Sequence, residues 1–201
     1  MNSRLILWEA LVEAYDNFYS LMLINVLWFL VTLPLVTAPA AAAGLYYSTN
    51  HLAHHGSFSW RIFFEGFRKH FWLGWRWALV NLFVLVVLAA NFIFYGGFEG
   101  DWTTLVRGGV IWLVILWLLL QLYTFPLLLE QVDRRMLVAV RNSVVLYIKS
   151  PGLSLGLIVL FILIAVLSSI LWIPWIIISV SLITFLTQKV MLAVLETVPS
   201  K

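Results

Sequence analysis

The chain has 201 residues, of which 63% are hydrophobic and only 10% are charged. Soluble domains carry about 45–50% apolar and about 25% charged residues, so this composition excludes a soluble fold and predicts an all-α, polytopic integral membrane protein. The net charge of +3, without a dense basic block away from membrane-adjacent segments, argues against nucleic-acid binding, and the absence of cysteine excludes disulfides and thiolate chemistry.

The N-terminal segment is predicted to be an acidic helix rather than a signal peptide. Glu9, Glu13 and Asp16 recur at helical spacing before the first apolar run. That run is longer than the hydrophobic region of a signal peptide, which has about 7–15 residues. Because an anionic membrane surface would repel these carboxylates, we expect the helix to dock on one of the two basic linkers described below. A solvated acidic face without a partner is the alternative.

Two apolar segments follow, and we predict that they are the first two of six membrane spans. Residues 18–36 are long enough for a spanning helix, which needs about 17–25 residues. Residues 38–53 are shorter and more polar, but the small side chains of residues 40–44 would let a neighbouring backbone approach closely. If 38–53 is instead a re-entrant or interfacial helix, five spans remain.

Four further spans are predicted in the rest of the chain. They lie at residues 72–94, 108–129, 153–171 and 174–195. The last two come from one apolar tract that Trp172, Pro174 and Trp175 interrupt, since proline breaks a helix and paired tryptophans suit a membrane interface. Gly152 and Gly156 form a GxxxG pattern, which predicts close helix packing either within the chain or in a homo-oligomer.

Lysine and arginine gather in two linkers, and these set the predicted orientation. The cations are Arg61, Arg68 and Lys69 between spans two and three, and Arg134, Arg135, Arg141 and Lys149 between spans four and five. By the positive-inside rule both linkers and the C-terminus face the cytoplasm, and six spans place the N-terminus there as well. Both linkers are predicted to be amphipathic helices lying against anionic lipid headgroups.

Several stretches of the sequence resemble the YesL-like family of bacterial membrane proteins, a domain of unknown function. The matching stretches are 25–28 (NVLW), 33–37 (LPLVT), 44–47 (GLYY), 63–71 (FFEGFRKHF) and 126–129 (PLLL). The resemblance spans most of the chain, with most of its specificity in the N-terminal third. It implies a small multi-span protein of the bacterial plasma membrane with a link to carbohydrate uptake, and it supplies no catalytic or ligand residues.

Three histidines form the candidate metal site. His51, His54 and His55 lie at i, i+3 and i+4, so one helix face would carry all three, and such a face could hold Zn²⁺ or Ni²⁺. No carboxylate lies near them in sequence to complete the ligand set. We therefore interpret them as interfacial histidines, and we expect no cofactor. Glu130 is expected to form an ordinary helical pair with Arg134, four residues further on.

Four amide side chains are the candidate polar positions within the membrane. Asn25, Asn81, Asn91 and Gln121 lie inside predicted spans. They either bond to neighbouring helices or line a substrate path, and we interpret them as helix-packing contacts. No Asp, Glu, Lys or Arg lies near the centre of a predicted span, which argues against a proton relay or an ion-coupled pump.

These observations predict a non-enzymatic membrane component, accessory or regulatory to a solute uptake system, with a sugar transporter permease as its partner. The first alternative is a small transporter or channel that acts alone, with the amides lining the route. The second is a metal-dependent membrane enzyme built on His51, His54 and His55.

Overall fold

The computed structural model describes residues 3–131 and 134–196, and this part of the chain is helical without any β-strand. The helices are α1 (Ser3–Asp16), α2 (Phe18–Thr32), α3 (Ala38–His55), α4 (Trp60–Lys69), α5 (Phe71–Gly96), α6 (Asp101–Glu130), α7 (Met136–Lys149), α8 (Pro151–Leu171), the short π-helical segment η1 (Trp175–Ser179) and α9 (Val180–Glu196). The predicted all-α class is confirmed.

Among the described residues, four helices are long and apolar enough to cross a membrane: α5, α6, α8 and the continuous segment Trp175–Glu196. Helices α1 and α2 meet the same test only as a pair, and they are bent by 76°. The structure thus gives four or five candidate spans where the sequence predicted six. The predicted span 38–53 is the helix α3, whose polar second half, with Asn50 and His51, excludes it from this set.

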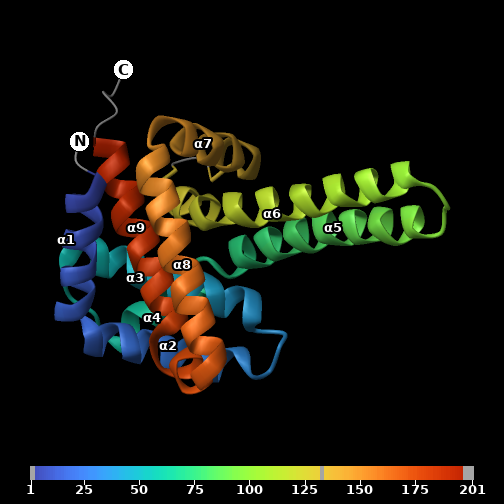
Figure 1. Cartoon of the computed structure of the whole chain (residues 1–201). Helices are drawn as coiled ribbons and strands as arrows, with labels where there is room; N and C mark the ends of the chain where they lie inside the picture. Colours follow the sequence, from blue (N-terminus) through green and yellow to red (C-terminus); the bar gives the residue numbers. More distant parts are fainter. Residues whose placement is uncertain (1–2, 132–133, 197–201) are drawn as a thin grey trace.

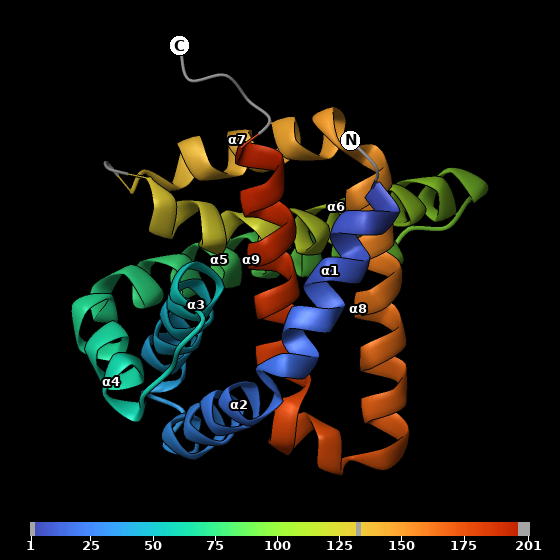
Figure 2. The same cartoon turned by 90° about the vertical axis from the view of Figure 1, so that its left-hand side faces the viewer.

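The apolar helices form two hairpins that run crosswise to each other. Helices α8 and α9 lie side by side with α1, while α5 and α6 form a long hairpin that projects beyond the rest of the molecule (Figure 1). Helix α7 lies at the end of α8 and α9 opposite their connecting turn, as the rotated view in Figure 2 also shows. Helix α3 packs against α2, α4, α5 and α9, so it joins the base of the projecting hairpin to the remaining helices.

Small side chains allow α3 to contact its neighbours at backbone distance. A Cβ atom added at Gly74 of α5 would lie 2.3 Å from the carbonyl oxygen of Pro39, and one added at Gly66 of α4 would lie 2.6 Å from the Cβ of Tyr47. No side chain fits in either gap without movement. The close approach predicted for residues 40–44 is seen at Gly44, where an added Cβ would lie 3.1 Å from the carbonyl oxygen of Phe63 in α4.

The acidic helix α1 packs on α8 and α9. Glu13 forms an ion pair with Lys189 of α9, and Leu7 covers Gly156 of α8, where an added Cβ would lie 2.4 Å from the Leu7 Cδ1. The predicted docking on a basic linker is thus replaced by docking on these two helices, because the partner cation comes from the last helix of the chain. The absence of a side chain at Gly156 therefore allows close packing of α1 on α8 within the chain.

Candidate functional site

Two indole–amide hydrogen bonds join the helices of the projecting hairpin. The Trp77 Nε1 of α5 donates to the Gln121 Oε1 of α6 at 2.9 Å, and the Trp117 Nε1 of α6 donates to the Asn81 Oδ1 of α5 at 3.0 Å. Each helix supplies one tryptophan and one amide. Because the two helices are antiparallel, the tryptophan of each one lies beside the amide of the other. The structure therefore places Asn81 and Gln121 between α5 and α6, where their oxygens hold the hairpin together.

Asn91, the third amide of this hairpin, has a local contact only. Its side chain is exposed, and its Nδ2 donates to the carbonyl of Val87 in the same helix at 2.8 Å. This amide therefore stabilises no contact between helices in the structure.

Asn25 is fully buried and connects α2 to the start of the last helix. Its Nδ2 donates to the carbonyls of Trp175 at 2.8 Å and Ile176 at 2.7 Å, while its Oδ1 accepts the backbone N–H of Ser181 at 2.9 Å. A π-helical turn interrupts the regular α-helical hydrogen-bond ladder and leaves carbonyls that need another donor. Asn25 supplies that donor, so one amide satisfies the irregular turn at η1.

A polar junction joins α3, α6 and α9. The His54 Nε2 lies 3.0 Å from the Glu130 Oε1, and the Asn50 Nδ2 donates to the same oxygen at 2.6 Å. Asn50 also lies 3.5 Å from the Oε1 of the buried Gln188. Glu130 thus bonds across 76 residues to His54. Sequence spacing alone suggested only its neighbour Arg134.

The three candidate histidines engage three different partners. The His51 Nδ1 lies 3.2 Å from the carbonyl of Ser57, the His55 Nδ1 lies 3.1 Å from the carbonyl of His51, and His54 contacts Glu130. The rings of His51 and His55 stack with centroids 4.3 Å apart. Within residues 3–131 and 134–196, no group of three or more histidine and carboxylate side chains is arranged to hold a metal ion.

A cavity of about 630 Å³ opens between α1, α3 and α9. Its ionisable lining consists of Glu9, Glu13, Glu196, His54 and Lys189. The cavity is where the acidic stripe of α1 meets the last helix, and carboxylates outnumber cations in its lining. The acidic stripe is evident in the sequence, but its place beside α9 is not, since Lys189 lies far along the chain from Glu13.

The two basic linkers meet at His70, between α4 and α5. The Arg134 Nη1 lies 3.4 Å from the His70 Nδ1, and His70 is almost completely buried. Burial, followed by the nearby charges of Arg134 and Lys69, lowers the pKa of His70 to about 4. The imidazole is therefore neutral at physiological pH and can accept a hydrogen bond from the guanidinium. This contact brings the second basic linker to the end of the first.

Comparison with known proteins gives one match, over part of the chain. No curated protein and no solved structure matches the sequence. Residues 21–92, which run from α2 into α5, match the model of a family described as "Protein of unknown function, DUF624". For this segment, which contains Asn25, the three histidines and Asn81, the match supports a membrane-protein domain of unknown function.

Proposed function

We propose that this chain is a non-enzymatic accessory subunit of a solute uptake system, and that the α5–α6 hairpin packs against the membrane helices of a transporter permease. One observation carries the proposal. The most apolar 18-residue window of α5 contains no residue that is buried inside the chain. A helix that is apolar all round belongs in contact with lipid or with other membrane helices.

The surface of the hairpin suits a helical partner. An apolar groove of about 520 Å³ runs between the two helices, and its lining includes Leu88, Phe92, Val114 and Ile115. Helices associate within membranes by close van der Waals packing, because lipid already solvates their apolar side chains. A groove between two ridges offers such packing to a third helix, which a smooth apolar surface does not.

The alternative of a transporter acting alone has less support from the geometry. A polar route through the membrane needs side chains that are free to meet a solute. The oxygens of Asn81 and Gln121 accept indole N–H groups, and Asn25 makes three hydrogen bonds to the backbone of the last helix. The oxygens of Asn81 and Gln121 and the whole amide of Asn25 are therefore committed to helix–helix contacts, while the buried Nε2 of Gln121 has no hydrogen-bond partner among the described residues.

The placement of the chain in the membrane is part of the proposal. The membrane is a bacterial plasma membrane, and both basic linkers and the C-terminus lie in the cytoplasm. Helices α4 and α7 lie as amphipathic helices along the cytoplasmic surface. An even number of spans places the N-terminus on the same side, and an odd number places it outside. The class of solute, a carbohydrate, rests on the resemblance to the YesL-like family.

Photo-cross-linking in cells tests the proposed partner. A photoreactive residue at Phe83 or Trp112 sits on the outer surface of the hairpin, and one at Leu163 provides a control on α8 with similar exposure. We expect the hairpin positions, and not the control, to give an adduct with one permease, identified by mass spectrometry. Loss of the chain should also reduce uptake of the solute of that permease.

Two results would overturn the proposal. An adduct of twice the mass of this chain would identify a homo-oligomer interface instead. Cross-linking to lipid alone from Phe83 and Trp112, with unchanged solute uptake after deletion, would leave the hairpin as an ordinary lipid-facing element.

A further inference from the structure

Helix α4 has three faces with different chemistry, and one of them is buried. Phe63, Gly66 and the following His70 lie on the side that packs against α3. This packing fixes the rotation of α4 about its own axis, because Tyr47 of α3 occupies the space that a side chain at position 66 would need. The two remaining faces are therefore held in a defined direction.

The second face carries aromatic rings. Trp60, Phe64 and Phe67 recur at i, i+4 and i+7, which places them in one narrow stripe along α4, and Phe71 follows as the first residue of α5. Neighbouring rings meet edge to face, with centroids 6.1 Å apart for Trp60 and Phe64 and 5.9 Å apart for Phe67 and Phe71. The exposed Trp72 extends this stripe into α5. Such rings favour the boundary between headgroups and acyl chains.

The third face carries cations, two of which lie over aromatic rings: the Arg61 guanidinium is 5.6 Å from the centroid of the Trp60 ring, and the Lys69 Nζ is 5.4 Å from that of Tyr47. Arg61, Arg68 and Lys69 are exposed, and none of them forms an ion pair with a carboxylate of the described residues. Glu65 lies between them, but its Oε1 accepts the hydroxyl of Tyr47 at 2.9 Å and is thus bonded to α3. The three cations and this one carboxylate together leave a net charge of +2, which can attract an anion.

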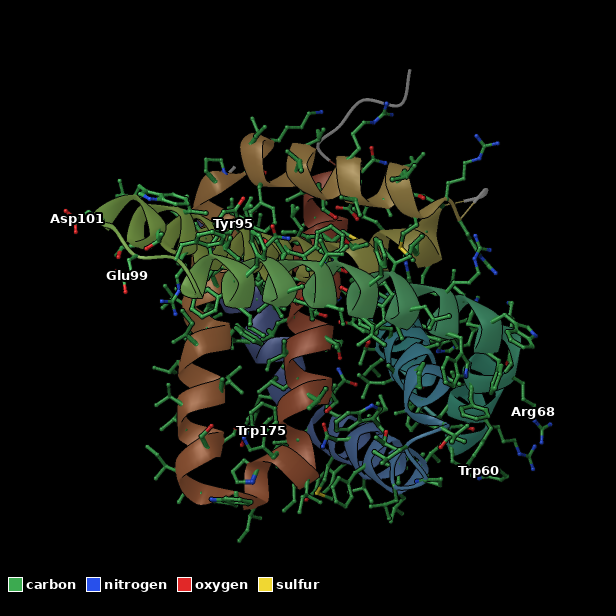
Figure 3. The ribbon with its side chains drawn as sticks, turned by 90° about the vertical axis from the view of Figure 1, so that its right-hand side faces the viewer. Trp60, Arg68, Tyr95, Glu99, Asp101 and Trp175 are labelled. Carbon is green, nitrogen blue, oxygen red and sulfur yellow. The ribbon has the colours of Figure 1, made fainter. Side chains whose placement is uncertain are left out.

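A hollow lies where the aromatic and cationic faces adjoin. It has a volume of about 790 Å³, and it is lined by Trp60, Arg61, Phe64, Glu65, Arg68 and Lys69. In Figure 3, Trp60 and Arg68 lie at the base of the α5–α6 hairpin, while Glu99 and Asp101 lie at its tip. The cations of α4 and the two carboxylates at the tip are therefore separated by the length of an apolar hairpin, as expected if its base lies at the cytoplasmic membrane surface. Arg107 is a cation near the tip, where its guanidinium lies over the ring of Phe92.

We propose that α4 binds an anionic phospholipid of the cytoplasmic leaflet. Arg61, Arg68 and Lys69 hold the phosphate, and the stripe beginning with Trp60 and Phe64 contacts the upper part of an acyl chain. A guanidinium can donate two parallel hydrogen bonds to a phosphate, and a cluster of cations beside aromatic anchors favours a charged lipid over a zwitterionic one. The proposal rests on the cytoplasmic placement of the first basic linker and not on the accessory role.

Lipid retention by the purified full-length protein tests this site. The protein is reconstituted in phosphatidylcholine nanodiscs containing a minor fraction of phosphatidylglycerol, re-extracted in detergent, and analysed for bound phosphatidylglycerol. Arg61→Gln with Arg68→Gln removes two cations from α4. The matched control, Arg141→Gln with Lys149→Gln, removes two exposed cations from α7. We expect roughly a tenfold loss of bound phosphatidylglycerol in the α4 variant and little change in the control.

The two variants separate a site on α4 from general attraction. Equal losses in both would overturn the proposal, and so would unchanged retention in the α4 variant. If the double variant fails to fold, Arg68→Gln alone serves, since Arg68 has an exposed side chain. Its bound phosphatidylglycerol must then fall relative to Arg141→Gln. Cross-linking of the hairpin to a permease does not depend on either result, so the two proposals fail separately.

Discussion

At the scale of single residues, amides and indoles join one helix to another: the buried Asn25 joins α2 to the last helix, and half-buried pairs of an amide and an indole join α5 to α6. Asn25 satisfies carbonyls 150 and 151 residues away, and Trp77 and Trp117 each find an amide across the α5–α6 hairpin. Composition and hydropathy locate such amides within apolar runs, but no periodicity identifies a partner on another helix. The sequence thus identifies the polar side chains within apolar runs, whereas only the tertiary arrangement defines their hydrogen-bond partners.

Replacing Asn25 with alanine is expected to destabilise the fold. The change leaves the carbonyls of Trp175 and Ile176 and the N–H of Ser181 without their partner. Buried groups left unpaired cost about 1–3 kcal/mol, so the unfolding midpoint in detergent should fall clearly below that of the parent. Asn91→Ala is the control, since that amide bonds only within its own helix. Equal midpoints for the two variants would contradict the bridging role of Asn25.

At the scale of helices, apolar runs predicted the later elements well. The predicted spans 72–94 and 153–171 correspond to Phe71–Gly96 and Pro151–Leu171, because long apolar runs bounded by polar residues leave little freedom in their ends. The predicted span 108–129 lies within α6, which starts earlier, at Asp101. Polar residues at the tip of the hairpin are part of α6, but a prediction based on apolar runs leaves them out.

The first apolar run was predicted less well, because its helix follows a bend at Asn17 and ends before the run does. The side chain of Asn17 donates to the carbonyl of Glu13 at 2.9 Å, between α1 and α2. Asparagine side chains that bond to nearby backbone compete with the regular helical ladder. Further along, α2 ends at Thr32, and Leu35 after Pro34 has a left-handed φ of 54°. The predicted single span 18–36 therefore begins just after a bend and ends early.

The crossing of α3 and α5 should depend on the absence of a side chain at Gly74. Gly74→Ala places a Cβ against the backbone of Pro39, which cannot move aside as a flexible side chain would. We expect a drop in the unfolding midpoint equivalent to about 1–3 kcal/mol, typical of overpacking. Gly108→Ala in α6 is the matched control, because a Cβ there meets nothing within 4 Å. If both variants are equally stable, α5 does not cross α3 at this distance.

At the scale of the whole molecule, the two crosswise hairpins impose a condition on how the chain enters a membrane. Helix α5, with 26 residues, is about 39 Å long, which exceeds a hydrocarbon core of about 30 Å. A flat bilayer can hold only one of two crosswise hairpins along its normal (Figures 1 and 2). Both can span only if one turns relative to the other on insertion. Pro126 marks a weak point for such a turn, since it lacks the N–H that would bond within α6.

The central claim is that this is a multi-span membrane protein with both basic linkers on one side. Its most direct test is a measurement of membrane topology. The chain has no native cysteine, so single cysteines can be labelled with a membrane-impermeant maleimide in intact cells. The four positions are the hairpin tips, Asp101→Cys and Ile173→Cys, and the basic linkers, Ser57→Cys and Val144→Cys, all of which are exposed in the structure. Ser3→Cys, added to this set, decides between an even and an odd number of spans. We expect both tips to be labelled from outside, and both linkers only after the membrane is permeabilised. Labelling of a linker in intact cells, or protection of a tip, would contradict this topology.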